Sequence, residues 1–383
     1  MELSEDQQQF KDVVQRFFAD KSPPSVVRQL MAASDGYDPA VWRQLSRELG
    51  LAGSHIPEAY GGFGFGPVEL GLVAEEMGRS LYCGPFFASS IMAGFALLEL
   101  GSESAKQQTL PMIADGSLIA TLVLDDLNDA ARLGRSLKVT GGKISGRAGM
   151  VLDAGIAGRL LVIAKNDKGL GLYQVEPLAK GVSIESLEVL DPTRKLYAVQ
   201  FNDTPFELLG QVDSASLQLL WDRMCLTLAH EMIGGAQYLL DSTIEYTKLR
   251  VQFGRQIGSF QSMKHRCADM LMELELAKSV VRFTSHSMAT TRKDDHLDDL
   301  QDGLSSTLPS SLPSMAKAMA SDVYMTIAKA AVQLRGGIGF TWENDTHLWF
   351  KRAKSSEVFL GSPHIHRERM MCLLEESQDA AIG

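Results

Sequence analysis

Hydrophobic positions near the start of the chain recur with the spacing of an amphipathic helix. Five apolar side chains follow one another at intervals of three and four residues, which places them on one helix face that we expect to pack against a core. Ser4, with Gln7 three residues later, predicts a capping box at the start of this helix. The apolar positions are Phe10, Val13, Val14, Phe17 and Phe18.

Similar helical spacing is found at residues 69–78, after a glycine-rich stretch at 60–67, and again at residues 86–100. Residues 1–115 are therefore expected to form a helical bundle with one glycine loop. Residues 81–98 lack charge, but Gly84 and Pro85 break the run early, so the pattern favours a buried helix over a membrane span.

The pattern changes near Gly116 to short apolar runs separated by turn residues, which is typical of a β segment. This segment closes around residues 201–205, so we expect a β domain over 116–210. The predicted strands lie at residues 119–124, 137–140, 143–145, 159–165 and 170–175.

Helical spacing returns at Ser214 and continues in long helices near residues 259–290 and 313–334. Gly336 and Gly337 predict the end of the second of these helices. Residues 211–383 are therefore expected to form a C-terminal helical domain, which makes the whole chain an α+β multidomain protein.

Composition narrows the classes of partner. The chain has 383 residues, of which 45% are hydrophobic and 22% charged, as in ordinary globular proteins. The 37 Lys and Arg against 47 Asp and Glu give a net charge of −10, which argues against nucleic acid and anionic membranes as partners.

Four cysteines, with neither a CxxC pair nor a secretory leader, predict reduced thiols in a cytoplasmic protein. We interpret Cys83, Cys225, Cys267 and Cys372 as buried small apolar residues. The acidic residues between 292 and 309 lack the spacing of metal ligands, so we expect a solvated loop there and no metal site.

Residues 245–261 are the most informative segment. The pattern predicts that one helix ends here, that Phe253 and Gly254 form a turn, and that a new helix starts at Ser259. Arg250 and Gln252 then lie beside exposed backbone groups and a helix N-terminus, which together suit an anion. A helix corner with a solvated arginine fits the same spacing equally well.

A second segment, residues 333–341, combines Gln333 with Gly336, Gly337 and Gly339. The missing side chains would let a flat or phosphorylated ligand approach the backbone, although glycines also simply end helices. The segment does not match GxGxxG and no strand precedes it, so a Rossmann site is not predicted.

A third segment, residues 359–367, begins a C-terminal helix. Ser362 is a suitable N-cap and Pro363 a suitable first helical residue. His364 and His366 are two residues apart and point to different sides of a helix, so they make a poor metal pair.

These three segments, in this order, resemble the acyl-CoA dehydrogenases along nearly the whole chain. Ile56, Pro57 and Glu58 before the glycine-rich stretch are shared with that family as well. Among its members, the chain is most similar in character to the small subunit of pimeloyl-CoA dehydrogenase and related bacterial proteins, some of which look like partners in mixed-subunit assemblies.

The resemblance implies a helical bundle, a middle antiparallel β-barrel and a C-terminal four-helix bundle, binding FAD and an acyl-CoA thioester. It also implies a homodimer, homotetramer or mixed-subunit tetramer that passes electrons to an electron-transfer flavoprotein. Gln333, Gly336 and Gly337 match a turn that reaches the FAD of a neighbouring subunit, and Ser362 is counted among the cofactor-binding positions. The positions that match those holding the FAD pyrophosphate and adenosine are Arg250, Gln252, Phe253, Ile257, Phe260 and Gln261.

In the family, a glutamate removes the proton next to the thioester carbonyl while the β-hydrogen leaves as hydride to flavin N5, giving a trans-2-enoyl-CoA. The two usual positions of that glutamate are Leu360 and Met224 in this chain, so the catalytic base is unknown. Asp222 and Glu231 are the nearest acids on the helix of Met224. Glu231 is the candidate base, and a buried structural acid paired with a neighbouring helix is the alternative.

The β segment departs from the family too, because residues 124–131 lack the Gly-Ser element of the loop that binds the flavin ring and CoA. Three hypotheses follow. The chain is an FAD-dependent dehydrogenase subunit for a medium or bulky acyl chain with a relocated base, a non-catalytic partner that completes the FAD site of a companion, or a CoA-ester-binding protein without flavin. The arginine and glutamine of the 250–261 segment favour the first two.

Overall fold

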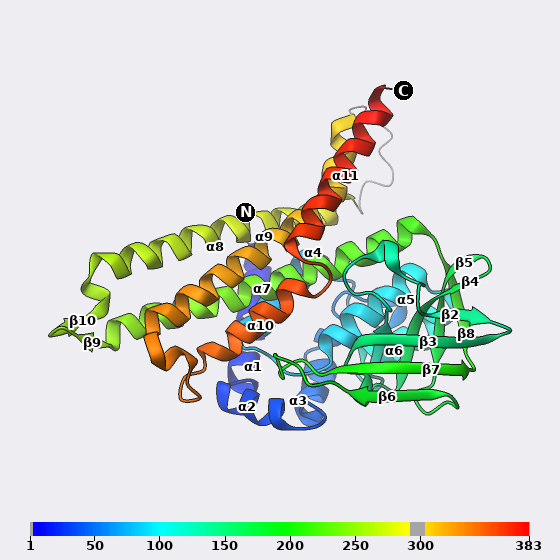
Figure 1. The fold of residues 1–383 in the computed structure, drawn as a ribbon, viewed down its shortest axis with the longest axis horizontal. Coiled ribbons are helices and arrows are strands. Elements are labelled where there is room, and N and C mark those ends of the chain that lie inside the picture. Colours follow the sequence, from blue (N-terminus) through cyan, green and yellow to red (C-terminus); the bar gives the residue numbers. More distant parts are fainter. Residues whose placement is uncertain (1–2, 292–302, 383) are drawn as a thin grey trace. The chain divides into compact units, whose positions relative to one another are not determined.

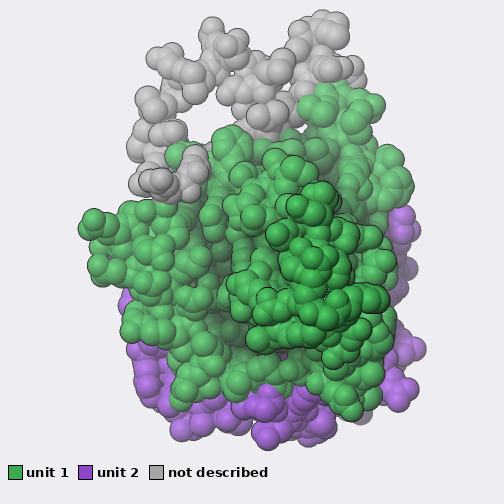
Figure 2. All heavy atoms as spheres, turned by 90° about the vertical axis from the view of Figure 1, so that its left-hand side faces the viewer, with its two compact units in different colours: residues 1–24, 67–82, 225–383 green, residues 25–66, 83–224 purple. Residues whose placement is uncertain are grey.

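The computed structural model describes the backbone of residues 3–291 and 303–382 (Figure 1). Of the loop expected at 292–309, residues 292–302 lie outside the described residues, and the expectation is wrong for residues 303–309, whose backbone is helical. The chain folds into two compact units, coloured separately in Figure 2. Unit 1 comprises Met1–Pro24, Pro67–Tyr82 and Cys225–Gly383, and unit 2 comprises Ser25–Gly66 and Cys83–Met224. The three-part division at 115 and 210 stays a prediction.

Unit 1 begins with α1 (Glu5–Lys21), whose predicted capping box is confirmed. Ser4 Oγ accepts the Gln7 N–H at 3.2 Å, and Gln7 Oε1 accepts the Ser4 N–H at 3.1 Å. The apolar face is narrower than expected: Val14 and Phe18 are buried, but Val13 is 41% exposed. Only part of the predicted stripe therefore faces the core.

Helices α4 (Pro67–Arg79) and α7 (Ser214–Leu249) cross at glycines within unit 1. A Cβ atom on Gly78 would lie 1.9 Å from the Glu231 carbonyl oxygen, and one on Gly234 would lie 1.8 Å from the Glu75 carbonyl oxygen. The two backbones therefore approach more closely than any side chain would allow.

The rest of unit 1 is built around α9 (Gly303–Arg335), which packs against α8 (Gln261–Thr291), α10 (Thr346–Val358) and α11 (Pro363–Ile382). Figure 1 shows α8, α9 and α10 running side by side. The expected helix start near Pro313 is wrong, because α9 begins ten residues earlier and Pro313 lies inside it. The predicted start of α11 at Pro363 is confirmed.

The helices of unit 2 include two π-helical stretches, η1 and η4. The uncharged run predicted to be a buried helix forms η4 and α5, where residues 86–97 are buried, so this prediction is confirmed. Among the described residues, no helix combines the length and the apolar character needed to cross a membrane. The elements are α2 (Pro24–Ala32), α3 (Pro39–Arg43), η1 (Gln44–Glu48), η2 (Leu51–Gly53), η3 (Glu58–Tyr60), η4 (Phe86–Ala93), α5 (Gly94–Leu100) and α6 (Glu103–Ala114).

Unit 2 also holds an eight-stranded sheet with the order β6-β7-β3-β2-β4-β5-β8, in which β1 pairs with β4. Its core is formed by apolar residues from alternate positions of these strands, such as Val162, Tyr173 and Phe201. The strands are β1 (Ala120–Val123), β2 (Lys138–Thr140), β3 (Lys143–Leu152), β4 (Arg159–Asn166), β5 (Gly169–Val175), β6 (Val182–Ser186), β7 (Leu196–Thr204) and β8 (Glu207–Val212).

The expected antiparallel β-barrel is wrong in two respects. The sheet is mixed, because β1 and β2 both pair with β4 in parallel. It is also open, because the outer strands β6 and β8 do not pair with each other in the described residues. Turns between consecutive strands suggested hairpins throughout, whereas β1 and β4 are joined by a long connection that brings them together in the same direction.

The expectation that all four cysteines are buried is also corrected. Cys83 and Cys225 are buried and Cys267 is half-buried, but Cys372 is exposed on α11. All four are free thiols.

Candidate functional site

The segment that follows α7 forms the predicted turn. It is a two-stranded hairpin of β9 (Val251–Gln252) and β10 (Arg255–Gln256), closed by the Ile257 N–H donating to the Arg250 carbonyl at 2.8 Å. Phe253 and Gly254, at its tip, have φ angles of 54° and 78°. Two consecutive positive φ angles match the twist of a tight hairpin, which explains the Gly at the second position.

The hairpin presents its side chains to solvent. Arg250 and Gln252 are exposed, and Phe253 is 90% exposed. The Phe253 ring meets the Phe260 ring edge-on at 6.2 Å, and the Arg255 guanidinium lies 4.0 Å from the centre of the Phe260 ring. A cationic and aromatic surface results. Arg255 was not predicted to belong to it, although its place in the hairpin is the signal that could have revealed it.

The base of the hairpin is fixed by its connection to α8. Ile257 is buried and begins a 3₁₀ turn, η7 (Ile257–Ser259). The Ser259 hydroxyl donates to the Gln256 carbonyl at 2.7 Å. Gln261 is the first residue of α8, two positions later than expected, so its exposed amide lies at a helix N-terminus.

The glycine turn after α9 forms the 3₁₀ helix η8 (Gly336–Phe340). Gly336 has a φ of 65°, and a Cβ atom on Gly336 or Gly337 would meet no heavy atom within 4 Å. The surface beside these glycines is open to a ligand. Gln333 Oε1 accepts a hydrogen bond from Arg266 Nη1 at 3.0 Å, which ties the turn to the start of α8.

Arg335 attaches the same turn to the end of α7. Its guanidinium donates to the hydroxyls of Thr243 at 2.7 Å and Ser242 at 2.9 Å, and its carbonyl accepts the Tyr246 hydroxyl at 3.5 Å. The hairpin and the glycine turn, far apart in sequence, therefore lie together at one end of unit 1, where β9 and β10 appear in Figure 1. We call this surface the hairpin end.

The third segment, around Leu360, is elsewhere in unit 1. Leu360 is fully buried with a φ of 59°, and Gly361 follows with a φ of 100°. The Leu360 carbonyl accepts a hydrogen bond from His366 Nε2 at 2.9 Å, and Cys225 Sγ lies 3.8 Å from the same oxygen. Ser362 is half-buried directly before α11. We call residues 359–362 the Leu360 turn.

A buried lysine holds the Leu360 turn against α9. Lys317 is fully buried, and its ammonium donates to the carbonyls of Ser356 at 3.1 Å, Glu357 at 3.3 Å and Gly361 at 3.0 Å. It also donates to the Ser321 hydroxyl at 3.0 Å. The charge thus caps the carbonyl end of α10. Sequence reasoning missed Lys317, although one lysine among small and apolar helix residues was a usable signal.

His366 is neutral in this environment. Its pKa is lowered to about 3, chiefly by burial and also by the nearby charges of Lys317 and Arg369, while the hydrogen bond to the Leu360 carbonyl opposes this shift. A carbonyl can only accept, so Nε2 carries the proton and Nδ1 accepts from the Ser314 hydroxyl at 3.1 Å. The prediction that His364 and His366 point to different sides agrees with the exposed His364 and the buried His366.

Neither position that the resemblance predicts for the base carries a titratable side chain. Met224 and Leu360 are both fully buried. Glu231 is 8% exposed, and its Oε1 accepts a hydrogen bond from Arg352 Nη1 at 2.7 Å. Both carboxylate oxygens of Asp222 accept from the side-chain Nε2 of Gln218, each at 3.1 Å. The ion pair with α10 is the arrangement expected of a structural acid, because a buried carboxylate is stable only when paired.

The loop that follows β1, which was predicted to depart from the family, is closed by hydrogen bonds to the Asp125 carboxylate. Asp125 Oδ1 accepts the Gly134 N–H at 3.0 Å, while Oδ2 accepts the N–H groups of Ser136 at 2.6 Å and Leu137 at 3.1 Å. These backbone donors are therefore already used within the loop. The sequence showed that the Gly-Ser element is missing, but it did not predict these hydrogen bonds to Asp125.

A buried charged network links α4, α7 and α8. Glu75 Oε1 lies 3.0 Å from His230 Nδ1, and His230 Nε2 lies 2.7 Å from the Ser285 hydroxyl. Burial alone would raise the pKa of Glu75, but His230, Arg282 and Lys11 together lower it to about 2. Glu75 is therefore a paired carboxylate that holds these helices together.

No group of three or more potential metal ligands occurs among the described residues. Positions predicted to contact FAD thus fall into two places in unit 1, the hairpin end and the Leu360 turn. The structure brings Arg250, Phe253, Gln333 and Gly336 together, and it places Ser362 apart from them. Their role in binding FAD stays a prediction.

The N-terminal and C-terminal parts of the chain match known domain families. Residues 4–117 match the model of the acyl-CoA dehydrogenase N-terminal domain, and residues 213–372 match that of the C-terminal domain. Acyl-CoA dehydrogenase IpdE2 of Mycobacterium tuberculosis is 32% identical over 363 residues, which is 94% of each chain. IpdE2 of Mycolicibacterium smegmatis is 31% identical over 96% of this chain and 98% of its own.

Solved structures share the fold. A variant of the Tcur3481-Tcur3483 steroid ACAD superposes with a TM-score of 0.84 at 27% identity, covering 98% of this chain and 99% of that one. Butyryl-CoA dehydrogenase from Megasphaera elsdenii gives a TM-score of 0.84 at 22% identity, with the same coverage. At that identity the second likeness shows the fold alone. The domain matches and the near full-length relatives together establish that this chain belongs to the acyl-CoA dehydrogenase family.

Proposed function

We propose that the chain is a subunit of an FAD-dependent acyl-CoA dehydrogenase, acting in the α,β-dehydrogenation of an acyl-CoA thioester to a trans-2-enoyl-CoA. The observation that carries the proposal is the hairpin end. There an exposed guanidinium from Arg250, an exposed ring from Phe253 and the open backbone at Gly336 and Gly337 form one surface. Such a surface suits a pyrophosphate joined to flat rings.

The residues present fit FAD at the hairpin end. Arg250 would bind the pyrophosphate, with Gln252 and the N-terminal Gln261 of α8 as further hydrogen-bonding groups. Phe253 and Phe260 would contact a ring face, and Gln333 would orient the ligand while Gly336 leaves room for it. The loop at 124–137 fits less well, because Asp125 already accepts its N–H groups.

When bound, FAD supplies the hydride acceptor, flavin N5, for the hydrogen lost from the β-carbon. The α-proton must go to a base, and the Leu360 and Met224 positions cannot take it. Glu231 could take it only by leaving Arg352. Residues around the Leu360 turn instead exclude water and fix the backbone, since Lys317 and His366 together hold the carbonyls of Leu360 and Gly361.

A second candidate function is a non-catalytic partner that completes the FAD site of a companion chain carrying the base. The ion pair of Glu231 with Arg352 and the occupied Asp125 loop favour it. Both observations remove a group that an autonomous enzyme would need. The two functions share the hairpin end and differ in whether this chain alone turns over substrate.

The assembly and substrate follow from the same proposal. We expect a homodimer, homotetramer or mixed-subunit tetramer that passes electrons to an electron-transfer flavoprotein. The name of the Tcur3481-Tcur3483 relative pairs two chains and mentions a steroid, which supports a mixed assembly and a bulky, ring-bearing acyl group. A cytoplasmic location is part of the same proposal.

The test is the absorption spectrum of the purified chain, with flavin stoichiometry and anaerobic addition of straight, dicarboxylic and ring-bearing acyl-CoA esters. If an acyl-CoA ester bleaches the flavin bound to the chain without any companion, the chain is a complete enzyme. Bleaching only after a companion with glutamate at the Leu360 position is added identifies a partner. A chain that holds no flavin alone or with such a companion would overturn both.

Two variants make the test specific. Arg250→Ala should lose most of the flavin, while Lys248→Ala, an exposed residue paired with Glu245 at 2.7 Å on the preceding turn, should keep it. Glu231→Gln should leave any bleaching intact if the glutamate is structural. Loss of bleaching with unchanged flavin content and melting temperature would identify Glu231 as the base.

A further inference from the structure

Unit 2 contains a cavity that plays no part in the proposed reaction. Its volume is about 480 Å³, within the range of small-molecule sites, and every residue that lines it belongs to unit 2. It lies between α3 with its π-helical extension η1, the end of α6, and the segments before β1 and β4. The residues used below are Tyr37, Trp42, Arg43, Arg47, Ile119 and Ile156.

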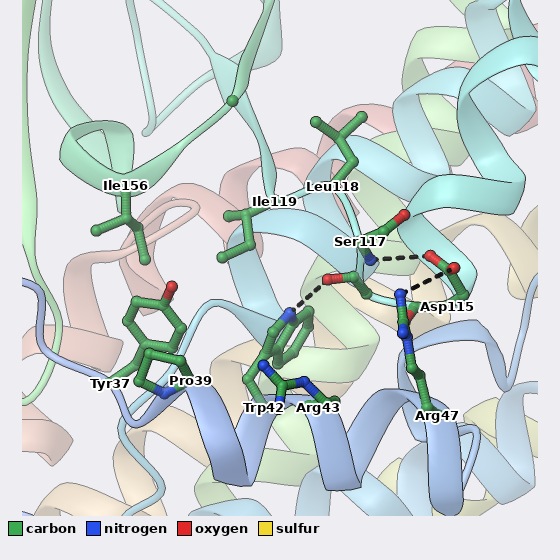
Figure 3. A pocket seen from close by; sticks show the side chains of 12 residues that line it. Tyr37, Pro39, Trp42, Arg43, Arg47, Asp115, Ser117, Leu118, Ile119 and Ile156 are labelled. Atoms are coloured by element: carbon green, nitrogen blue, oxygen red, sulfur yellow. Dashed lines mark hydrogen bonds and ion pairs between the residues drawn. The ribbon is translucent and has the colours of Figure 1, made fainter.

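Aromatic and aliphatic side chains form part of the lining, beside polar and charged ones such as Arg43 and Arg47. Figure 3 shows Tyr37 and Ile156 on one side, facing Trp42 and Ile119 on the other. Ile119 and Ile156 are both partly exposed to the cavity. The half-buried Tyr37 ring and the half-buried side chains of Ile119 and Ile156 favour an apolar ring as the ligand, because such a ring can contact both sides of the cavity at once.

One wall is held rigidly. Trp42 is 4% exposed, and its Nε1 donates to the Gly116 carbonyl at 3.0 Å. Asp115 caps the Ser117 N–H at 2.8 Å and pairs with the Arg47 guanidinium at 3.6 Å (Figure 3). The cavity is therefore formed before a ligand arrives, which lowers the entropic cost of binding.

The charge of the cavity favours an anion. Arg43 lies one turn before Arg47 on the same helix, and only Arg47 is paired with Asp115. Arg43 is exposed and makes no ion pair or hydrogen bond with any described residue, so its guanidinium is available. The nearby Asp38 is engaged as the N-cap of α3, accepting the N–H groups at its first turn.

Tyr37 adds a second polar group. Its hydroxyl makes no hydrogen bond within the described part of the chain and points into the cavity in Figure 3. Burial, with a smaller contribution from Asp35, raises the pKa of this phenol. The hydroxyl therefore keeps its proton and can donate to an acceptor.

We propose that this cavity binds a small aromatic carboxylate, with its rings between Tyr37 and Ile156 on one side and Ile119 on the other, and with its carboxylate paired with Arg43. A planar guanidinium can donate two parallel hydrogen bonds to a carboxylate. The residues that line the cavity belong to unit 2, whereas those of the hairpin end and the Leu360 turn belong to unit 1.

Calorimetry with the purified full chain tests the proposal, using 2-naphthoate, the neutral 2-naphthylmethanol and inorganic phosphate as probes. Naphthoate should bind one molecule per chain, about tenfold more tightly than the alcohol. Phosphate alone should not bind there. Equal binding of naphthoate and alcohol would overturn the role of Arg43, and binding of phosphate in competition with naphthoate would overturn the role of the walls.

Variants locate the site. Arg43→Leu should weaken naphthoate about tenfold and leave the alcohol unchanged, whereas Arg135→Leu, an exposed arginine of unit 2 outside the cavity, should change neither. Ile156→Trp should fill the cavity and abolish binding of both. Naphthoate binding that survives Ile156→Trp in a protein of unchanged melting temperature would place the ligand elsewhere and overturn the proposal.

Discussion

Leu360, which is predicted to stand at the family's glutamate position, adopts a left-handed backbone conformation. The side chain is fully buried and φ is 59°. This conformation costs a non-glycine residue about 1–2 kcal/mol. It persists because Lys317 and His366 fix the carbonyls of the turn. These hydrogen bonds therefore hold the turn in a conformation that a leucine disfavours.

A pair of substitutions at Leu360 measures this strain. Leu360→Gly should be roughly 0.5 to 1 kcal/mol more stable than Leu360→Ala, because both lose the same buried side chain but only glycine relieves the left-handed backbone. At Leu274, buried in the middle of α8, the order should reverse, with alanine about 1 kcal/mol better. Denaturant unfolding gives both differences, and the same order at the two sites would contradict the argument.

The neutral His366 makes stability depend on pH. Its pKa falls from 6.5 to about 3 on folding. Between these two pH values the histidine is therefore protonated in the unfolded chain and neutral in the folded protein. The stabilisation is complete above pH 6.5 and is lost as pH falls towards 3. Between about pH 7.5 and pH 5.5, the free energy of unfolding should drop by about 1.4 kcal/mol from this residue.

Unfolding at the two pH values, compared between variants, isolates this contribution. His366→Gln should remove the drop, and His364→Gln, which changes the exposed histidine two residues earlier, should retain it. If the wild type and His366→Gln lose the same free energy over this interval, the buried histidine is not the source.

At the scale of elements, the crossing of α4 and α7 depends on glycines. Gly78→Ala and Gly234→Ala should each destabilise the protein by about 2–3 kcal/mol, because the new Cβ would collide with a carbonyl oxygen of the other helix. Alanine normally stabilises a helix relative to glycine by about 1 kcal/mol, so the expected sign is the opposite of the intrinsic preference.

Thermal or denaturant unfolding decides the sign. Gly149→Ala, on strand β3 with no heavy atom within 4 Å of its Cβ position, serves as the control and should change stability little. A higher melting temperature for Gly78→Ala would mean that the two helices are not in backbone contact.

Local signals predicted elements well and pairings poorly. The capping box at Ser4, the turn at Phe253 and the start of α11 at Pro363 each depend on a few neighbouring residues, and the structure has all three. The parallel pairing of β1 with β4 depends on which distant strands meet. Strands of either direction carry the same apolar pattern, so the sequence could not distinguish a mixed open sheet from a barrel.

The same limit applied to the candidate site. Most residues of the hairpin end could be selected because they lie in two short motifs, each continuous in sequence. The partner of Glu231 is Arg352, 121 residues away, and Lys317 meets the Leu360 turn across two helices. A local sequence pattern does not show which distant residues meet. The partner of Glu231, the candidate base, could therefore be identified only from the fold.

At the scale of the whole molecule, the two groups of predicted FAD contacts lie far apart within one chain. Lys317, which touches the Leu360 turn, and Arg335, which precedes the glycine turn, are separated by roughly 27 Å along α9. We infer that the hairpin end and the Leu360 turn of one chain serve different flavin sites, each completed by another chain. This inference rests on the proposed function.

Complementation tests whether flavin sites are shared between chains. Arg250→Ala damages the hairpin end and Ser362→Trp blocks the Leu360 turn, so each variant alone should lose flavin. The two variants are then co-expressed with different affinity tags, and assemblies that contain both are purified through both tags. Such a two-chain assembly should regain flavin in up to about half of its sites, because one of its two sites pairs an intact hairpin end with an intact turn. Absorbance at the flavin band and native mass spectrometry measure this recovery. A doubly tagged assembly that forms but stays colourless would mean that each site is built within one chain, because every chain in it carries one damaged half.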